Sequence, residues 1–327
     1  MRRLAALLVV GVALATSGCV FVVGSPFGMF GGGPKPLEET TVEGQGRAKI
    51  LLLDVTGTIS DEPSSRAFGL VEEESTVGRV EAALAKAADD DRVKAVVLRV
   101  NSPGGGVTAS DDIHMQLLRF KREQQIPVIA ALGDTAASGG YYVACAADRI
   151  VAHPTTVTGS IGVILLSLDI EGLMAKIGVR NETYKAGEHK DLLSPLRAAT
   201  PEERHIVQRV LDHMHERFIA VVRAGRPGLD VARLPEITDG RIFDATQAQA
   251  LGLVDDIGSV HDAIELAKRA AGLTEARVVR YARRGETAET IAARSGGGAT
   301  QVNLLAVDLG ALQPSSPRFM YLWAPFL

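Results

Sequence analysis

Cysteine is scarce in this chain of 327 residues, which contains two, Cys19 and Cys145. Two cysteines cannot build a disulfide framework, and no cysteine spacing here is typical of a metal site. The seven histidines include no HExxH or similar pair, so we expect neither a structural nor a catalytic zinc ion. Nothing else in the sequence indicates a cofactor, and we predict none.

Aromatic residues and excess charge are also in short supply. Aromatics make up 5% of the chain, and the formal net charge is -4. A surface for nucleic acid needs a basic balance and stacking platforms, so this class of partner is excluded. The hydrophobic fraction of 46% is enough for the core of one large domain or two modest ones, but too low for a polytopic membrane protein.

The first 23 residues have the layout of a bacterial export signal. A basic start, Met1–Arg3, precedes the apolar run Leu4–Ala15, and small residues then lead to Cys19. One interpretation is a lipoprotein signal with Cys19 as the lipid acceptor, although Thr16 stands where that signal usually has leucine. The other is an uncleaved anchor over Leu4–Val23, which has the ~20 apolar residues that a bilayer requires. Both predict an exported, membrane-tethered protein of the bacterial cell envelope.

Beyond this segment, residues 24–47 are rich in glycine and proline and predict a flexible linker. Strands alternate with helices over residues 48–275, which predicts an α/β domain. The clearest strands are expected at 48–55, 93–100, 127–132 and 149–152, and the clearest helices at 107–124 and 200–223. Ser75 can cap a further helix, and Thr200 with Glu203 predicts a capping box at the start of the 200–223 helix. The expected buried face of that helix carries Val207, Leu211, Met214, Phe218 and Val222. Residues 276–327 form a C-terminal extension that ends in an apolar run, Phe319–Leu327. That run could dock on the chain's own core, on a neighbouring subunit, or near the active site or the membrane.

Two glycine-rich turns each follow a buried strand. One is Ser102–Gly106, and the other surrounds Ser138–Gly140. Ser138 is expected at a helix start, where unpaired backbone N–H groups favour developing negative charge. It could be a nucleophile, with the N–H groups of Gly105 and Gly139 as an oxyanion hole. The other interpretation is that Ser138 only caps the helix, as serine often does.

A nucleophilic serine needs a base. His153, His189 and His205 are available, and no spacing selects one of them. The alternative is a lysine, whose ordinary pKa of about 10.4 must be lowered by burial before the amine can accept a proton. Lys185 and Lys190, in a polar loop, are the lysine candidates.

Four motifs together resemble the signal peptide peptidase family of membrane-bound Ser–Lys proteases. They begin at Asn101, Ala137, Thr158 and Gly187, and read NSPGG, ASGGYY, TGSIG and GEHK with a later SP. The resemblance implies a Clp-protease/crotonase-like fold of repeated ββα units with a small helical C-terminal part. It implies Ser138 as nucleophile, Lys190 as general base and Ser160 as the serine that hydrogen-bonds the lysine.

The resemblance also implies Gly105 and Gly139 as oxyanion donors, and a homo-oligomer in which the lysine reaches the serine of a neighbouring subunit. Its expected substrates are apolar peptides such as released signal peptides. Two other functions fit the same fold: an inactive peptide-binding scaffold, and a crotonase-type acyl-CoA enzyme. The export segment argues against the second.

Overall fold

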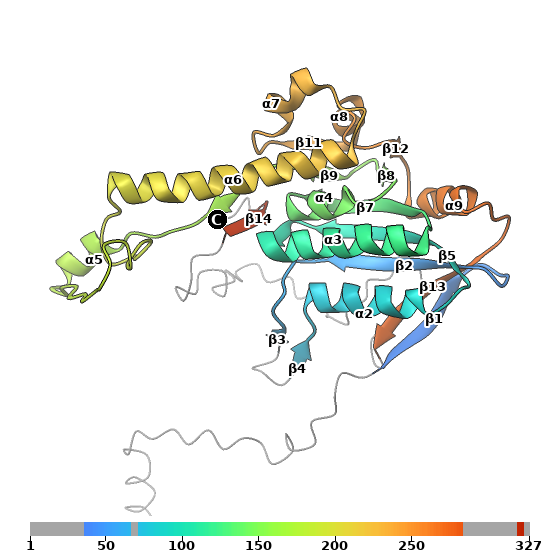
Figure 1. Ribbon diagram of the computed structural model, residues 1–327, viewed down its shortest axis with the longest axis horizontal. Helices are drawn as coiled ribbons and strands as arrows, with labels where there is room; N and C mark the ends of the chain where they lie inside the picture. Colours follow the sequence, from blue (N-terminus) through green and yellow to red (C-terminus); the bar gives the residue numbers. More distant parts are fainter. Residues whose placement is uncertain (1–35, 67–70, 284–318, 324–327) are drawn as a thin grey trace, which may run out of the picture. The chain divides into compact units, whose positions relative to one another are not determined.

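Parallel strands form the centre of the computed structural model, which describes residues 36–66, 71–283 and 319–323 (Figure 1). The predicted export segment, Cys19 and the first part of the predicted linker lie outside these residues. The main sheet has the order β1-β13-β2-β5-β7-β8-β12, with β9 joining β7 and β11 joining β9. Strands β2, β5, β7 and β8 are parallel, as are the pairs β13–β2, β12–β8 and β9–β7. The inner strands are β2 (Lys49–Thr56), β5 (Val93–Ser102), β7 (Val128–Ala137), β8 (Arg149–Ala152) and β9 (Val157–Gly159).

The edges of the sheet differ from the predicted domain boundaries. Strand β1 (Leu37–Glu43) lies inside the segment 24–47, and it pairs with β13 (Arg277–Arg283), which lies inside the segment 276–327. β1 is mostly polar because it is an edge strand with most of its side chains exposed, so it has no apolar pattern to distinguish it from a linker. The other peripheral strands are β11 (Ile242–Asp244) and β12 (Asp256–Ile257).

Helices cover both faces of the sheet, as expected for buried parallel strands. On one face lie α2 (Thr76–Ala88), α3 (Val107–Gln124) and α4 (Gly139–Ala144), which share a core with Leu51 and Leu98. On the other face α9 (Val260–Ala270) packs on Ile50, Leu52 and Val97. Helix α2 begins where the sequence predicts, because the Ser75 side chain accepts a hydrogen bond from the Gly78 N–H.

Helix α6 (Pro201–Gly225) is the longest helix of the described chain. Its 25 residues span about 37 Å at 1.5 Å per residue. The predicted capping box is present, since Thr200 and Glu203 each bond the other's backbone N–H. Near its C-terminus Phe218, Val221 and Val222 are buried, and α4 is its neighbour.

The predicted buried face of α6 is only partly correct. Val207, Leu211 and Met214 stay partly exposed, because the N-terminal part of α6 extends past the sheet (Figure 1). Before it come β10 (Ile164–Leu165), α5 (Glu171–Lys176) and a loop to Thr200. This arm, residues 163–217, exposes large apolar side chains, among them Leu168 (63%), Leu173 (58%) and Ile177 (66%).

Two small sheets complete the fold. Strands β3 (Ser64–Arg66) and β4 (Val71–Glu73) form a hairpin, while β6 (Gly104–Gly106) and β10 flank β14 (Phe319–Leu322). The remaining helical segments are η2 (Val231–Arg233), α7 (Leu234–Ile237) and α8 (Ala245–Ala250). The α/β fold class is therefore confirmed, and β5–β6–α3 is one of its ββα units. In the described part of the chain, no helix has both the length and the apolar character to span a bilayer.

Candidate active site

Ser138 stands at the junction between β7 and α4. Its backbone has φ 52° and ψ -119°, and its side chain makes no capping hydrogen bond to the helix. The residue is 1% exposed. A non-glycine residue held at positive φ costs about 1–3 kcal/mol and is typical of functional turns. The structure therefore does not support the interpretation of Ser138 as a simple helix cap.

Ser160 lies beside this junction because β9 is parallel to β7. Ala137 is opposite Gly159, and the Ser138 N–H donates to the Gly159 carbonyl at 2.8 Å. Ser160 follows directly, with φ 50°. Its own N–H donates to the Arg241 carbonyl at 2.7 Å. The strand pairing thus places the backbones of Ser138 and Ser160 side by side.

The glycine turn that contains β6 packs directly against the turn at Ser138. A Cβ on Gly104 would lie 2.7 Å from the Gly139 nitrogen, and one on Gly105 would lie 2.0 Å from the Ile59 carbonyl oxygen. Larger residues therefore cannot replace these glycines without moving the backbone. The buried Ser102 braces the turn: its hydroxyl donates to the Gly57 carbonyl at 2.6 Å and accepts from the Gly104 N–H at 3.0 Å.

The backbone of β6 has two sides. Toward Ile59 it presents the Gly104 carbonyl and the Gly106 N–H, each hydrogen-bonded at 2.9 Å. Gly105 therefore directs its own N–H to the opposite side, where β14 lies. Trp323 N–H donates to the Pro103 carbonyl at 2.8 Å, and Tyr321 is opposite Gly105. By the alternation of an antiparallel ladder, Tyr321 and Gly105 form the next hydrogen-bonded pair.

The Tyr321 carbonyl oxygen consequently lies against both glycine turns. It is 1.9 Å from the position of a Cβ on Gly104 and 3.1 Å from that of a Cβ on Gly139. The Tyr321 ring is fully buried. It stacks on Tyr142 and contacts Phe218, with ring centroids 5.1 and 4.7 Å away. The described part of the apolar tail thus docks on the chain's own core and also next to the candidate site.

Three polar residues that contact Tyr142 could not be predicted from the sequence. The Tyr142 hydroxyl donates to Asp111 at 2.5 Å, and Arg217 donates to the same oxygen at 2.9 Å. His114 meets the Tyr142 ring edge to face at 5.3 Å, and burial lowers the pKa of His114 to about 4. These residues lie on α3 and α6, so only the tertiary fold brings them to α4.

Lys190 lies on the loop between α5 and α6, and its side chain is exposed. Within the described residues its ammonium group makes no hydrogen bond or ion pair, and one chain alone does not pair it with Ser138. The loop lies at the N-terminal end of α6, whereas α4 packs near the other end (Figure 1). Lys185, the other lysine candidate, which lies outside the GEHK motif, forms an ion pair with Asp191 at 2.6 Å.

The histidine alternatives are not paired with Ser138 either. His153 interacts with the Thr155 hydroxyl at 2.8 Å, and His189 lies 3.8 Å from Glu202. His205 is exposed on α6. Over residues 36–66, 71–283 and 319–323, no group of histidine, cysteine and acidic side chains could hold a metal ion. The geometry brings together a strained serine, two glycine turns and a peptide strand; serine hydrolases likewise hold their nucleophile in a strained strand-to-helix turn beside backbone N–H donors.

Comparisons with known proteins agree with this class. The model of "Peptidase family S49" matches residues 120–274. A putative signal peptide peptidase SppA of Enterococcus faecium is 40% identical over 253 residues, covering 77% of this chain and 72% of its own length. A putative protease of Synechocystis sp. is 37% identical over 264 residues, covering 81% and 88% of the two chains. This chain belongs to peptidase family S49, the SppA-like serine proteases.

A solved structure is also similar to this chain. It is a lysine-to-alanine mutant of the 1510-N membrane-bound stomatin-specific protease, in complex with a substrate peptide. The match has 17% sequence identity and a TM-score of 0.43, and covers 68% of this chain and 81% of the other.

Proposed function

We propose that this protein is a membrane-tethered serine endopeptidase that hydrolyses apolar peptides, such as cleaved signal peptides, with a Ser138–Lys190 dyad. The observation that carries the proposal is the strained turn at Ser138, packed against the glycines of β6. Family membership supports the peptidase class, and the name of the Enterococcus relative supports the choice of substrate.

The proposed reaction is acyl transfer. The neutral Lys190 amine takes the hydroxyl proton of Ser138, whose oxygen attacks the scissile carbonyl carbon. The N–H groups of Gly105 and Gly139 hold the resulting oxyanion. The C–N bond then breaks, Lys190 returns the proton to the leaving amine, and the acyl group stays on Ser138. Water, deprotonated by Lys190, hydrolyses this ester and regenerates the serine, while Ser160 hydrogen-bonds the lysine.

Strand β14 supports the way in which a peptide would bind. It lies antiparallel to both β6 and β10, so a substrate could add to the same edge in an extended form. The ring of Tyr321 fills a site formed by Tyr142 and Phe218. A peptide bound there would direct one apolar side chain into the same aromatic site and its carbonyl toward Gly105.

The arm supports a composite site in a homo-oligomer. Lys190 has no partner in the described part of its own chain, and exposed apolar residues such as Leu168 and Leu173 lie in the same arm. Such a surface is typical of a protein contact. We propose that the arm of one subunit packs on the next subunit and delivers Lys190 to that subunit's Ser138. The S49 relatives and the apolar run before Cys19 support tethering to the bacterial cell envelope.

Complementation tests this proposal. Ser138→Ala and Lys190→Ala should each abolish hydrolysis of an apolar peptide and, for Ser138→Ala, labelling by a fluorophosphonate. Refolding the two inactive variants together at equal amounts should restore activity at about one site in four, because a head-to-tail ring pairs intact residues from neighbouring subunits. The wild-type rate should rise from pH 6 toward 10. An active Lys190→Ala variant would refute the dyad, and inactive mixtures would refute the composite site.

A further inference from the structure

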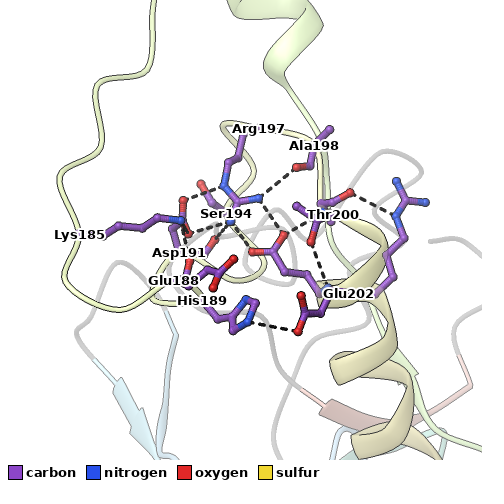
Figure 2. A network of polar contacts seen from close by, with 12 residues as sticks. Lys185, Glu188, His189, Asp191, Ser194, Arg197, Ala198, Thr200 and Glu202 are labelled. Carbon is purple, nitrogen blue, oxygen red and sulfur yellow. Dashed lines mark hydrogen bonds and ion pairs between the residues drawn. The ribbon is translucent and has the colours of Figure 1, made fainter.

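Charged side chains of the loop between α5 and α6 form a network with one another and with the first turn of α6 (Figure 2). Arg197 donates from Nε and Nη2 to the two carboxylate oxygens of Asp191, both at 2.7 Å. It also donates from Nη1 and Nη2 to Glu203, at 2.8 and 2.5 Å. Lys185 completes the set with a 2.6 Å bond to Asp191. Two cations and two carboxylates thus form a chain of ion pairs with no net charge.

This network ties the loop to a rigid support. Glu203 is 2% exposed, and its carboxylate also accepts the Thr200 N–H at 2.9 Å in the capping box. It therefore belongs to the first turn of α6, and the fork of Arg197 joins that turn to Asp191. Because a bidentate arginine pair fixes orientation as well as distance, Asp191 is held in one place.

Asp191 is the residue directly after Lys190. Its hydrogen bonds to Arg197 and Lys185 hold the pKa of the Asp191 carboxyl well below its usual range, so it carries a negative charge at any pH of interest. An unoccupied carboxylate beside a lysine would form an ion pair with the ammonium and stabilise its charged form. Here Arg197 bonds both carboxylate oxygens and Lys185 bonds Oδ1 as well, and Lys190 has no carboxylate partner in the described structure.

We propose that Arg197 is a positioning residue for the peptidase reaction: it holds Asp191 away from Lys190, so that the Lys190 amine can lose its proton and act as a base. The proposal rests on the proposed function, since it requires Lys190 to be that base. The other charged groups of this region are Glu171 on α5, Arg180, Glu182, Glu188 and His189 on the loop itself, and Glu202 and Arg204 on α6.

Removing the arginine should change the pH dependence of the reaction, and not only its rate. In Arg197→Gln, Asp191 Oδ2 loses its partner and only Oδ1 stays bonded to Lys185. The carboxylate can then pair with Lys190, so the rise of kcat with pH should move about one unit toward alkaline pH. At pH 8 this corresponds to a loss of kcat of about tenfold, with a smaller change in KM and recovery near pH 10. In Arg197→Gln combined with Asp191→Asn, the carboxylate is absent and the profile should return to its original position.

The test is the pH profile of kcat for the full chain, with oligomer size and circular dichroism to check folding. Arg204→Gln is the matched control, because it removes an arginine charge from the first turn of α6 without touching Asp191; it should leave the profile unchanged. In Asp191→Asn alone the carboxylate is gone and Arg197 remains. The pH profile of kcat should therefore not move toward alkaline pH, in contrast to that of Arg197→Gln. Arg197→Lys keeps the charge without the fork and should show a partial shift.

Two results would overturn the inference. If Arg197→Gln lowers kcat by the same factor at every pH, and the double variant is no better, Arg197 only stabilises the loop. If Lys190→Ala keeps its activity in the same assay, Lys190 is not the base, and the proposed function falls together with this inference. If Lys190→Ala is inactive and the pH profile of Arg197→Gln is not shifted, only this inference fails and the proposed function stands.

Discussion

Replacing Tyr321 by alanine should loosen β14 from the candidate site. The Tyr321 ring is fully buried between Tyr142 and Phe218, and its hydroxyl donates to the Met214 carbonyl at 2.8 Å. Losing a buried ring of this size costs about 3–5 kcal/mol, and losing the hydrogen bond costs about 1 kcal/mol. Because β14 has four residues, this loss is a large share of what keeps the strand docked.

Tyr321→Ala should lower the stability of the protein and raise its activity. A docked β14 covers the Gly105 N–H, so hydrolysis of a short peptide requires the strand to leave. Each 1.4 kcal/mol lost from docking raises the undocked fraction about tenfold. A loss of about 3 kcal/mol can therefore raise kcat/KM up to about 100-fold, until the strand is mostly undocked.

Two measurements on each variant decide the question: kcat/KM for an apolar peptide, and the free energy of unfolding in urea. Tyr321→Phe is the matched control, because it keeps the ring and loses only the bond to Met214. It should lower stability by about 1 kcal/mol with a correspondingly small gain in activity. If Tyr321→Ala loses activity in parallel with stability, β14 supports the site and does not occupy it, and the reasoning is wrong.

Three further changes have definite expected outcomes. Gly105→Ala would place a Cβ 2.0 Å from the Ile59 carbonyl and should lower kcat about 100- to 1000-fold by displacing an oxyanion donor; Gly106→Ala, whose nearest atom is 3.6 Å away, should stay active in the same assay. Burial lowers the pKa of His114 to about 4, so between pH 6.5 and 4 the unfolded chain binds a proton that the folded chain does not. The free energy of unfolding should fall by up to about 3 kcal/mol as the pH is lowered through that window, and urea titrations of His114→Phe should lack this fall. Thr200→Ala removes half of a capping box and should cost about 1 kcal/mol by thermal denaturation; an unchanged melting temperature would show that the box adds nothing to the Arg197 network.

Local signals in the sequence predicted most of the fold. Helix α3 and strand β8 begin and end at the predicted residues, 107–124 and 149–152. The caps at Ser75 and Thr200 act within one turn of their helices, so neighbouring residues carry all the information. Ser138 was predictable as a strand-to-helix turn for the same reason. Its positive φ was not, because that conformation depends on contacts with β6 and β9.

The parts that the sequence could not predict depend on distant partners. Gly104–Gly106 looks like a turn, and becomes a strand only because β14 pairs with it from more than 200 residues away. The polar strand β1 needs β13 to define it. The exposed apolar side of α6 followed the helical period, but period alone cannot say whether the covering surface belongs to the same chain.

The length of α6 sets the direction in which the Lys190 loop points as well as its distance from the sheet. Each residue of a helix adds about 1.5 Å and turns the chain by about 100°. One residue inserted in the exposed part of α6 would therefore rotate the whole Lys190 loop by about a quarter turn relative to β7. Seven inserted residues, close to two full turns, would keep its direction and move it outward by about 10 Å. The arm can thus change in length only in steps of whole turns if Lys190 is to keep pointing the same way.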